Sequence, residues 1–191
     1  MTADEQELID KIRAAFAGVK LEDGISLNMT EYNDSGGCMP EFKEKASDDE
    51  RVDWQAIPDK TLEQFTVTFS FTDLKGFRFY IPAYMIWTIR NHKTSDSIIG
   101  CFAIYAIDPF RYLFKTISFL RWFTADQVEA MAAFLQYAVK SDGPLDDKVA
   151  GENLFKIRNA QQGGAGQPAT RPESKSEGGD KPQPESEGRS R

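Results

Sequence analysis

Apolar residues near the amino end of the chain recur every three or four positions. This spacing is typical of an amphipathic helix, and the positions are Leu8, Ile9, Ile12, Phe16 and Val19. Thr2 and Glu5 have the spacing of a capping box, and Gly18 is suited to a helix end. The pattern therefore predicts a first helix that begins just after Thr2 and ends near Gly18.

The hydrophobic pattern thins between residues 20 and 53. Within this stretch, TEYNDSGGCMPEF brings Asn, Asp, Ser, Gly-Gly and Pro close together, and these residues favour turns. We predict a long irregular loop here, with a short helix around residues 42–46.

Two patterns compete in the next segment, which begins at Trp54. Pro58 suits a helix start, and helical spacing is kept by Ile57, Leu62, Phe65 and Phe69. A strand pattern is also present, because apolar residues alternate there with Thr and Ser; they are Phe65, Val67, Phe69 and Phe71. Residues 62–71 are therefore either helix or strand on the sequence alone.

The segment from Thr72 to Asn91 is the expected centre of the core. Thr72 and Asp73 make a good helix start. Pro82 removes one backbone hydrogen bond from a helix, so we expect a kink or two short helices that meet there. From Pro82 to Asn91 the side chains are apolar on nearly all sides, which predicts burial on most faces.

Two further elements follow this segment. Residues 98–107 form either a helix or a short buried strand that ends before Pro109. Thr124 and Gln127 make another capping box. The helix after them carries a regular apolar stripe and stops before Gly143.

These patterns predict a mainly α fold, a compact helical bundle in one domain over residues 1–158. A short strand pair, and with it an α+β fold, is the alternative. Most of the 14 Phe, 6 Tyr and 3 Trp residues lie between residues 65 and 137, and burying so much aromatic surface requires one compact core.

The carboxyl end has a different composition. Residues 159–191 contain no Val, Ile, Leu, Met or aromatic residue, so they cannot offset the entropy of ordering. We expect a disordered polar tail. Its acidic and basic side chains balance, so the formal net charge of −7 lies on residues 1–158.

Charge and hydropathy argue against several classes of protein. A net charge of −7 offers no cationic surface to nucleic acid or to an anionic membrane, so neither is expected as a partner. The longest apolar runs are about half of the ~20 residues that cross a bilayer. The amino end, MTADEQELID, lacks the features of a secretion signal. We expect a soluble, cytoplasmic protein.

Few side chains suggest catalysis or metal binding. His92 is the only histidine, and it follows a basic helix end, where a structural role is the simpler interpretation. Cys101 lies in an apolar run and is expected to be a small buried hydrophobe. The acidic runs at residues 48–50 and 146–147 lack the spacing of a calcium loop. We therefore expect no catalytic group, no metal site and no cofactor.

A ligand site remains conceivable around five residues. Cys38 lies in a Gly-rich turn near Glu41, and a thiol beside a cation or a helix amino end becomes reactive. Tyr80, Tyr84 and Trp87 follow at helical spacing and are candidates for the lining of an aromatic pocket. Core packing explains these three more simply.

If the two tyrosines are buried, their hydroxyls need hydrogen-bond partners. Arg78 and Arg90 are close in the sequence, and either side chain is a candidate donor.

The segment GFRFYIPAYMIWTIRN, residues 76–91, resembles the bacterial DUF6714 family of uncharacterised proteins. The family's order is also kept by YNDSGGCMPEF, which holds Cys38 and Glu41, and by WQAIP, FSFTDLKGF and FTADQVEAMAAFLQY. The resemblance covers about residues 8–140. It implies no transferable activity, and by fold-level analogy it suggests a helical domain of bacterial accessory or interaction proteins.

The leading hypothesis is therefore a non-catalytic domain that binds another protein, with an acidic surface that favours a basic partner. The alternative is a small enzyme or small-ligand binder. Its site would use Cys38, Glu41, Tyr80, Tyr84 and Trp87. Whether the protein is an enzyme stays open, with the balance toward a negative answer.

Overall fold

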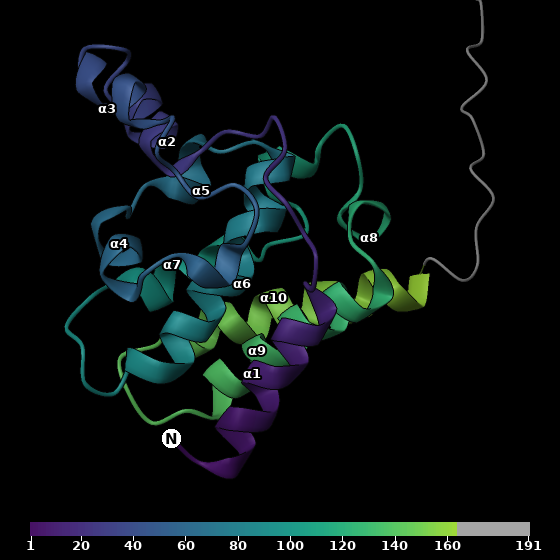
Figure 1. The fold of residues 1–191 in the computed structure, drawn as a ribbon. Coiled ribbons are helices and arrows are strands. Elements are labelled where there is room, and N and C mark those ends of the chain that lie inside the picture. Colours follow the sequence, from purple (N-terminus) through teal and green to yellow (C-terminus); the bar gives the residue numbers. More distant parts are fainter. Residues whose placement is uncertain (164–191) are drawn as a thin grey trace, which may run out of the picture.

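The computed structural model describes residues 1–163, which fold as helices joined by turns and loops, without a strand. The longer helices gather into one body, and a helical hairpin projects from it (Figure 1). In chain order the elements are α1 (Ala3–Ala15), α2 (Leu27–Asp34), α3 (Pro40–Lys45), η1 (Trp54–Ala56), α4 (Asp59–Gln64), α5 (Thr68–Phe71), α6 (Leu74–Asn91), α7 (Ile99–Ala106), η2 (Tyr112–Phe114), α8 (Phe119–Trp122), α9 (Ala125–Lys140) and α10 (Asp147–Gly163).

The expected mainly helical class is confirmed. Neither ambiguous segment is a strand: residues 62–71 hold the end of α4 and all of α5, separated by a break at residues 65–67, and residues 98–107 contain α7. The strand pair of the alternative is absent from residues 1–163. None of the helices in this part of the chain has both the length and the apolar character needed to cross a membrane.

Helix α6 is the centre of the fold. Most of its side chains are buried, and those of Phe77, Phe79, Tyr80 and Trp87 have no exposed surface. Helices α1, α4 and α7 pack against it, while α9 lies between α1 and α10 (Figure 1). The all-round apolar pattern of this segment is thus explained by neighbours on every side.

The predicted caps form as expected at three helix starts. Thr2 and Glu5 make a complete capping box at α1, and Thr124 and Gln127 make another at α9. The carboxylate of Asp73 accepts a hydrogen bond from the Gly76 backbone N–H at 2.8 Å and so caps α6. Local sequence signals therefore decide where these helices begin.

Pro82 lies inside α6, which continues through it from Leu74 to Asn91 as one helix. The expectation of two short helices is wrong. Proline leaves the carbonyl of the residue four positions earlier, Arg78, without its helical partner. Close packing on all sides of α6 offsets this loss and holds the helix together.

The predicted loop between residues 20 and 53 is partly helical. It contains α2, which was not expected, and α3, which corresponds to the short helix expected at residues 42–46. The Asp49 carboxylate accepts hydrogen bonds from the backbone N–H of Asn28 at 2.9 Å and from its side-chain amide at 2.6 Å. A residue far along the chain therefore caps α2, which local reasoning could not find.

Helix α10 continues to Gly163 and so passes the domain boundary expected at residue 158. Its buried residues Ala150 and Ile157 join the core, and the helix extends from this anchored part through Ala160 and two glutamines, which tolerate helical structure. Residues 159–163 are therefore helical. The rest of the expected tail, residues 164–191, lies outside the described part of the chain.

Candidate functional site

The structure separates the five residues that the sequence suggested for a ligand site. Cys38 and Glu41 are exposed on the hairpin formed by α2 and α3, which projects from the body of the protein (Figure 1). Tyr80, Tyr84 and Trp87 are at most 1% exposed. A ligand in contact with Cys38 therefore has no access to these aromatic side chains without opening the core.

The buried tyrosines have structural environments. The Tyr84 hydroxyl donates a hydrogen bond to the Phe65 carbonyl at 2.6 Å and lies 2.8 Å from the Thr68 hydroxyl. Burial raises the pKa of Tyr84 and of Tyr80 well above their usual value. Tyr84 therefore stays neutral and links α6 to the residues around α5.

Tyr80 and Trp87 differ in how their polar atoms are satisfied. The Tyr80 hydroxyl is buried and has no hydrogen-bond partner within residues 1–163. The Trp87 indole N–H donates to the Glu63 carboxylate at 3.3 Å. Neither tyrosine forms a hydrogen bond with Arg78 or Arg90, the partners that the sequence suggested. Tyr84 bonds with Phe65 and Thr68 instead, and the Tyr80 hydroxyl has no partner in the described part of the chain.

A polar cluster connects α1 with the ends of α6 and α9. The Glu5 carboxylate is 6% exposed and accepts hydrogen bonds from Lys93 Nζ at 2.7 Å and from the Tyr137 hydroxyl at 3.1 Å. The Lys93 bond and the Thr2 backbone lower the pKa of Glu5 from 4.5 to about 2. The His92 ring contacts the Tyr137 ring edge-on at 5.6 Å between centroids. These contacts tie α1 to the segments that follow α6 and to the end of α9.

An open, largely apolar groove lies at the start of α6, and we call it the Tyr112 groove. It has a volume of about 770 Å³. The loop before α2, the end of α5, the first turn of α6, η2 and α8 all contribute to it. Its apolar walls are Ile25, Phe71, Leu74, Tyr112, Leu113 and Trp122.

Hydrogen bonds fix the walls of the Tyr112 groove. The Trp122 indole N–H donates to the Leu74 carbonyl at 3.2 Å. Asp73, besides capping α6, accepts a hydrogen bond from the Ile25 backbone N–H at 3.2 Å. The Arg111 guanidinium donates to the Phe69 carbonyl at 2.6 Å and so holds the start of η2 against α5. The groove is preformed, because each wall is tied to another element.

A cluster of aromatic rings supports η2 and α8. Phe114 packs edge-on against Phe77 at 5.5 Å and against Phe119 at 5.0 Å between ring centroids. Phe123 packs against Phe119 at 4.8 Å. Such tilted and edge-on pairs are the favoured geometry of aromatic packing, so the short helices that carry Tyr112 and Trp122 rest on a rigid base.

Two aromatic residues near the groove are exposed to solvent. Tyr112 is 69% exposed and Phe110, two residues earlier, is 71% exposed. The ammonium group of Lys115 lies 5.9 Å from the centre of the Tyr112 ring. From the sequence, both residues were expected only as members of the aromatic-rich core between residues 65 and 137. Their exposure follows from the turns around η2, for which the sequence has no periodic signal.

Charges lie along one edge of the groove. Lys75 forms ion pairs with Glu22, at 2.8 Å, and with Asp23. These contacts raise the pKa of Lys75 above its usual value. No three His, Cys, Asp or Glu side chains converge as metal ligands would within residues 1–163. The chemistry that the groove offers is therefore apolar contact with charged groups at the edge.

Comparison with known proteins identifies a family. A model described as a family of unknown function, DUF6714, matches residues 4–156. No curated protein and no solved structure matches the chain.

Proposed function

Because this chain belongs to DUF6714, a family of unknown function, we propose a function from its structure: a non-catalytic domain that binds a segment of another protein in the Tyr112 groove. The observation that carries this proposal is the exposed Tyr112 at a preformed apolar groove of about 770 Å³. Protein surfaces that stay in water seldom keep large aromatic side chains together in this way.

The composition of the groove supports binding of a protein segment. Tyrosine and tryptophan are enriched at the energetically dominant positions of protein interfaces, and Tyr112 and Trp122 occupy two walls of this groove. A fixed base reduces the entropy lost on binding, because the walls need not be ordered by the partner.

The net charge of the domain indicates the charge of the partner that it binds. The chain has a formal net charge of −7, while Asp23 and Asp73 in the groove are balanced by Lys75 and Lys115. A segment with one apolar anchor residue for the groove, and basic residues that face the acidic domain around it, matches this charge distribution. The partner that we propose is therefore a basic protein segment, and its affinity should fall as salt is raised.

The test compares two exposed aromatic residues in different places. Tyr112→Ser removes the groove residue, whereas Phe155→Ser removes a side chain on α10 that is 66% exposed. Both positions are exposed, so both variants should fold. The full chain and each variant are used as bait in a lysate of the source organism, and the captured protein is identified by mass spectrometry and purified.

Binding is then measured with the purified partner. We expect Phe155→Ser to bind like the unchanged chain and Tyr112→Ser to lose about tenfold or more in affinity, as for an interface hot spot. Equal affinity of both variants would place the interface elsewhere. Capture of no protein at moderate salt would remove the support for an interaction domain.

A further inference from the structure

A second cavity lies next to the Tyr112 groove, and we call it the Arg78 pocket. It has a volume of about 420 Å³ and shares two walls with the groove, Lys75 and Trp122. Its other lining residues come from the turn after α1, from α6 and from the start of α9, and they include Gly18, Lys20, Glu22, Arg78, Thr124 and Gln127.

The Arg78 side chain lines this pocket without a partner for its charge within residues 1–163. Its Nε atom is buried and has no hydrogen-bond partner within residues 1–163. Its guanidinium forms no ion pair in that part of the chain. A buried donor left without an acceptor is costly, and a native fold seldom keeps one without a reason. The pocket in front of Arg78 is open to solvent on one side, so an acceptor from outside the chain can reach the part of the guanidinium that lines the pocket.

The pocket also holds an excess of positive charge. Lys20, Lys75 and Arg78 line it, against one carboxylate, that of Glu22. Glu22 and Asp23 both pair with Lys75, so the charge of Lys75 is already neutralised and neither carboxylate compensates Arg78. Lys20 and Arg78 remain as cations without a carboxylate partner within residues 1–163, and they favour a negatively charged ligand.

The start of α9 adds polar groups to the pocket. The Thr124 hydroxyl accepts a hydrogen bond from the Gln127 backbone N–H at 3.2 Å, and the Gln127 side chain accepts one from the Thr124 backbone N–H at 3.2 Å. These bonds use only the side-chain oxygens as acceptors, so the Thr124 O–H and the Gln127 NH₂ remain donors. They add to the donors of Arg78 and Lys20 that line the pocket.

We propose that the Arg78 pocket binds a small ligand through an oxyanion group, a phosphate or a carboxylate. Arginine presents planar, paired donors that match two oxygens of such a group. In this site the terminal NH₂ groups of the Arg78 guanidinium provide the directed hydrogen bonds, and Lys20 provides charge at the rim. The Trp122 ring forms one wall for the body of the ligand. This site does not depend on the partner of the Tyr112 groove.

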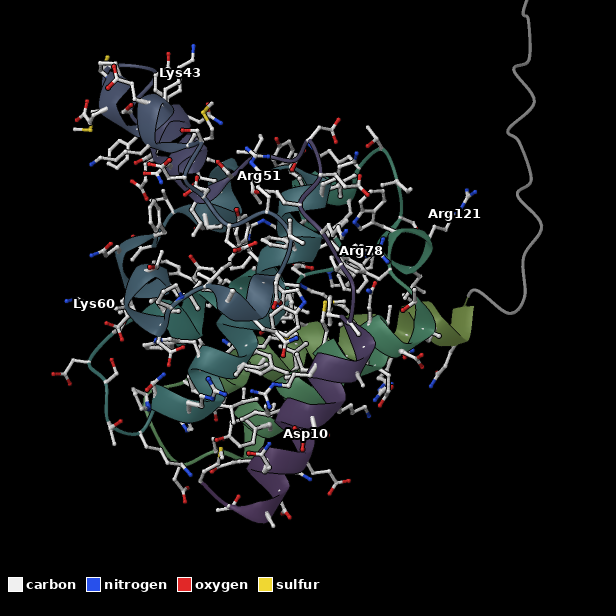
Figure 2. All side chains as sticks on the ribbon, viewed as in Figure 1. Asp10, Lys43, Arg51, Lys60, Arg78 and Arg121 are labelled. Atoms are coloured by element: carbon white, nitrogen blue, oxygen red, sulfur yellow. The ribbon has the colours of Figure 1, made fainter. Side chains whose placement is uncertain are left out.

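The test uses two probes, pyrophosphate and citrate, at constant ionic strength maintained with NaCl. Their binding to the full chain is measured by isothermal titration calorimetry and by the shift in melting temperature. Arg78→Gln removes the proposed anchor. Arg121→Gln is the matched control, because Arg121 is exposed and points away from the body of the protein, whereas Arg78 lies within it (Figure 2).

We expect saturable binding of at least one probe to the unchanged chain and to Arg121→Gln, and about tenfold weaker binding to Arg78→Gln. The stronger probe tells whether phosphate or carboxylate is the preferred group. If Arg78→Gln does not fold, Lys20→Gln serves as the test variant. Lys20 is exposed, so this variant should fold, and the loss of its charge should weaken the binding of the probe.

Two results would overturn the proposal. One is the absence of saturable binding by either probe. The other is an equal response of all variants, which indicates a general effect of the salts. In the second case Arg78 has only a structural role, and Arg78→Gln lowers the melting temperature without altering the response to anions.

Discussion

Replacing Glu5 by glutamine tests whether a buried carboxylate stabilises the contact of α1 with the rest of the fold. Glu5 accepts hydrogen bonds from Lys93 and Tyr137, at 2.7 and 3.1 Å, and from the Thr2 backbone N–H at 2.7 Å. These bonds favour the ionised form, so the pKa of Glu5 falls from 4.5 to about 2 in the folded protein. Burial opposes this shift but does not cancel it.

The lowered pKa of Glu5 determines how the stability of the fold changes with pH. A carboxylate whose pKa is lower in the folded state stabilises the fold fully above the unfolded pKa, here 4.5, and loses its contribution as the pH falls toward about 2. The whole shift corresponds to about 3 kcal/mol. Because Lys93 is 52% exposed, screening by water reduces the expected contribution of Glu5 to about 1–2 kcal/mol.

The assay is urea unfolding followed by circular dichroism at several pH values between 7 and 3. We expect the unchanged chain to be more stable than Glu5→Gln by about 1–2 kcal/mol at pH 7, and this difference should shrink as the pH approaches 3. Glutamine retains an oxygen that can accept the Thr2 N–H, so the capping box is preserved. The substitution therefore removes the charge and leaves the cap.

Glu7→Gln is the control, since Glu7 is exposed on the same helix and forms no ion pair within residues 1–163. It should follow the pH profile of the unchanged chain. A stability difference for Glu5→Gln that stays constant from pH 7 to pH 3 would refute the argument, because the lost stability would then not come from ionisation.

Three further predictions concern packing and exposure. Trp87→Ala should lower the free energy of unfolding by about 3–5 kcal/mol in urea denaturation, since Trp87 is 0% exposed; a loss below about 1 kcal/mol would contradict its place in the core. Gly76→Ala should cost about 1–3 kcal/mol in the same assay, because a Cβ there would lie 2.0 Å from the Thr72 hydroxyl oxygen; unchanged stability would show that the contact is not tight. Cys38 is exposed and Cys101 only partly exposed, so mass spectrometry after brief iodoacetamide treatment should find Cys38 modified first, and the reverse order would contradict the structure.

Local sequence signals were enough to predict the fold class and several helix boundaries. The capping boxes at Thr2 and Thr124 need only residues three positions apart, and the structure has both. The apolar segment around Trp87 was expected to be central, and it is the most buried helix. Such features are predictable because their causes lie within one turn of the chain.

Features with distant causes were missed. Helix α2 has few strong helix formers, and the Asp49 carboxylate that caps it lies outside the helix and far along the chain. Helix α10 is held by the hydrogen bond from the Asn153 side chain to the Ile104 carbonyl at 3.0 Å, a contact between segments that no short pattern connects. Tertiary contacts of this kind override local propensity.

The candidate site could not be predicted for the same reason. Phe71, Tyr112 and Trp122 form one groove only because α5, η2 and α8 meet at the start of α6. Arg78 was considered as a partner for the core tyrosines, yet it faces a pocket instead. Sequence spacing identifies residues on one face of one helix, whereas this groove is built from five separate segments.

The hairpin of α2 and α3 has a consequence for how the protein opens. No side chain of α3 is buried, and the turn that precedes it passes through Gly36 and Gly37 with positive φ angles of 62° and 82°. Local unfolding of this part breaks few buried contacts and therefore costs little free energy. Its amide hydrogens should exchange with deuterium long before those of α6. A protease should likewise cut here first, and the helices around α6 should stay folded after the cut.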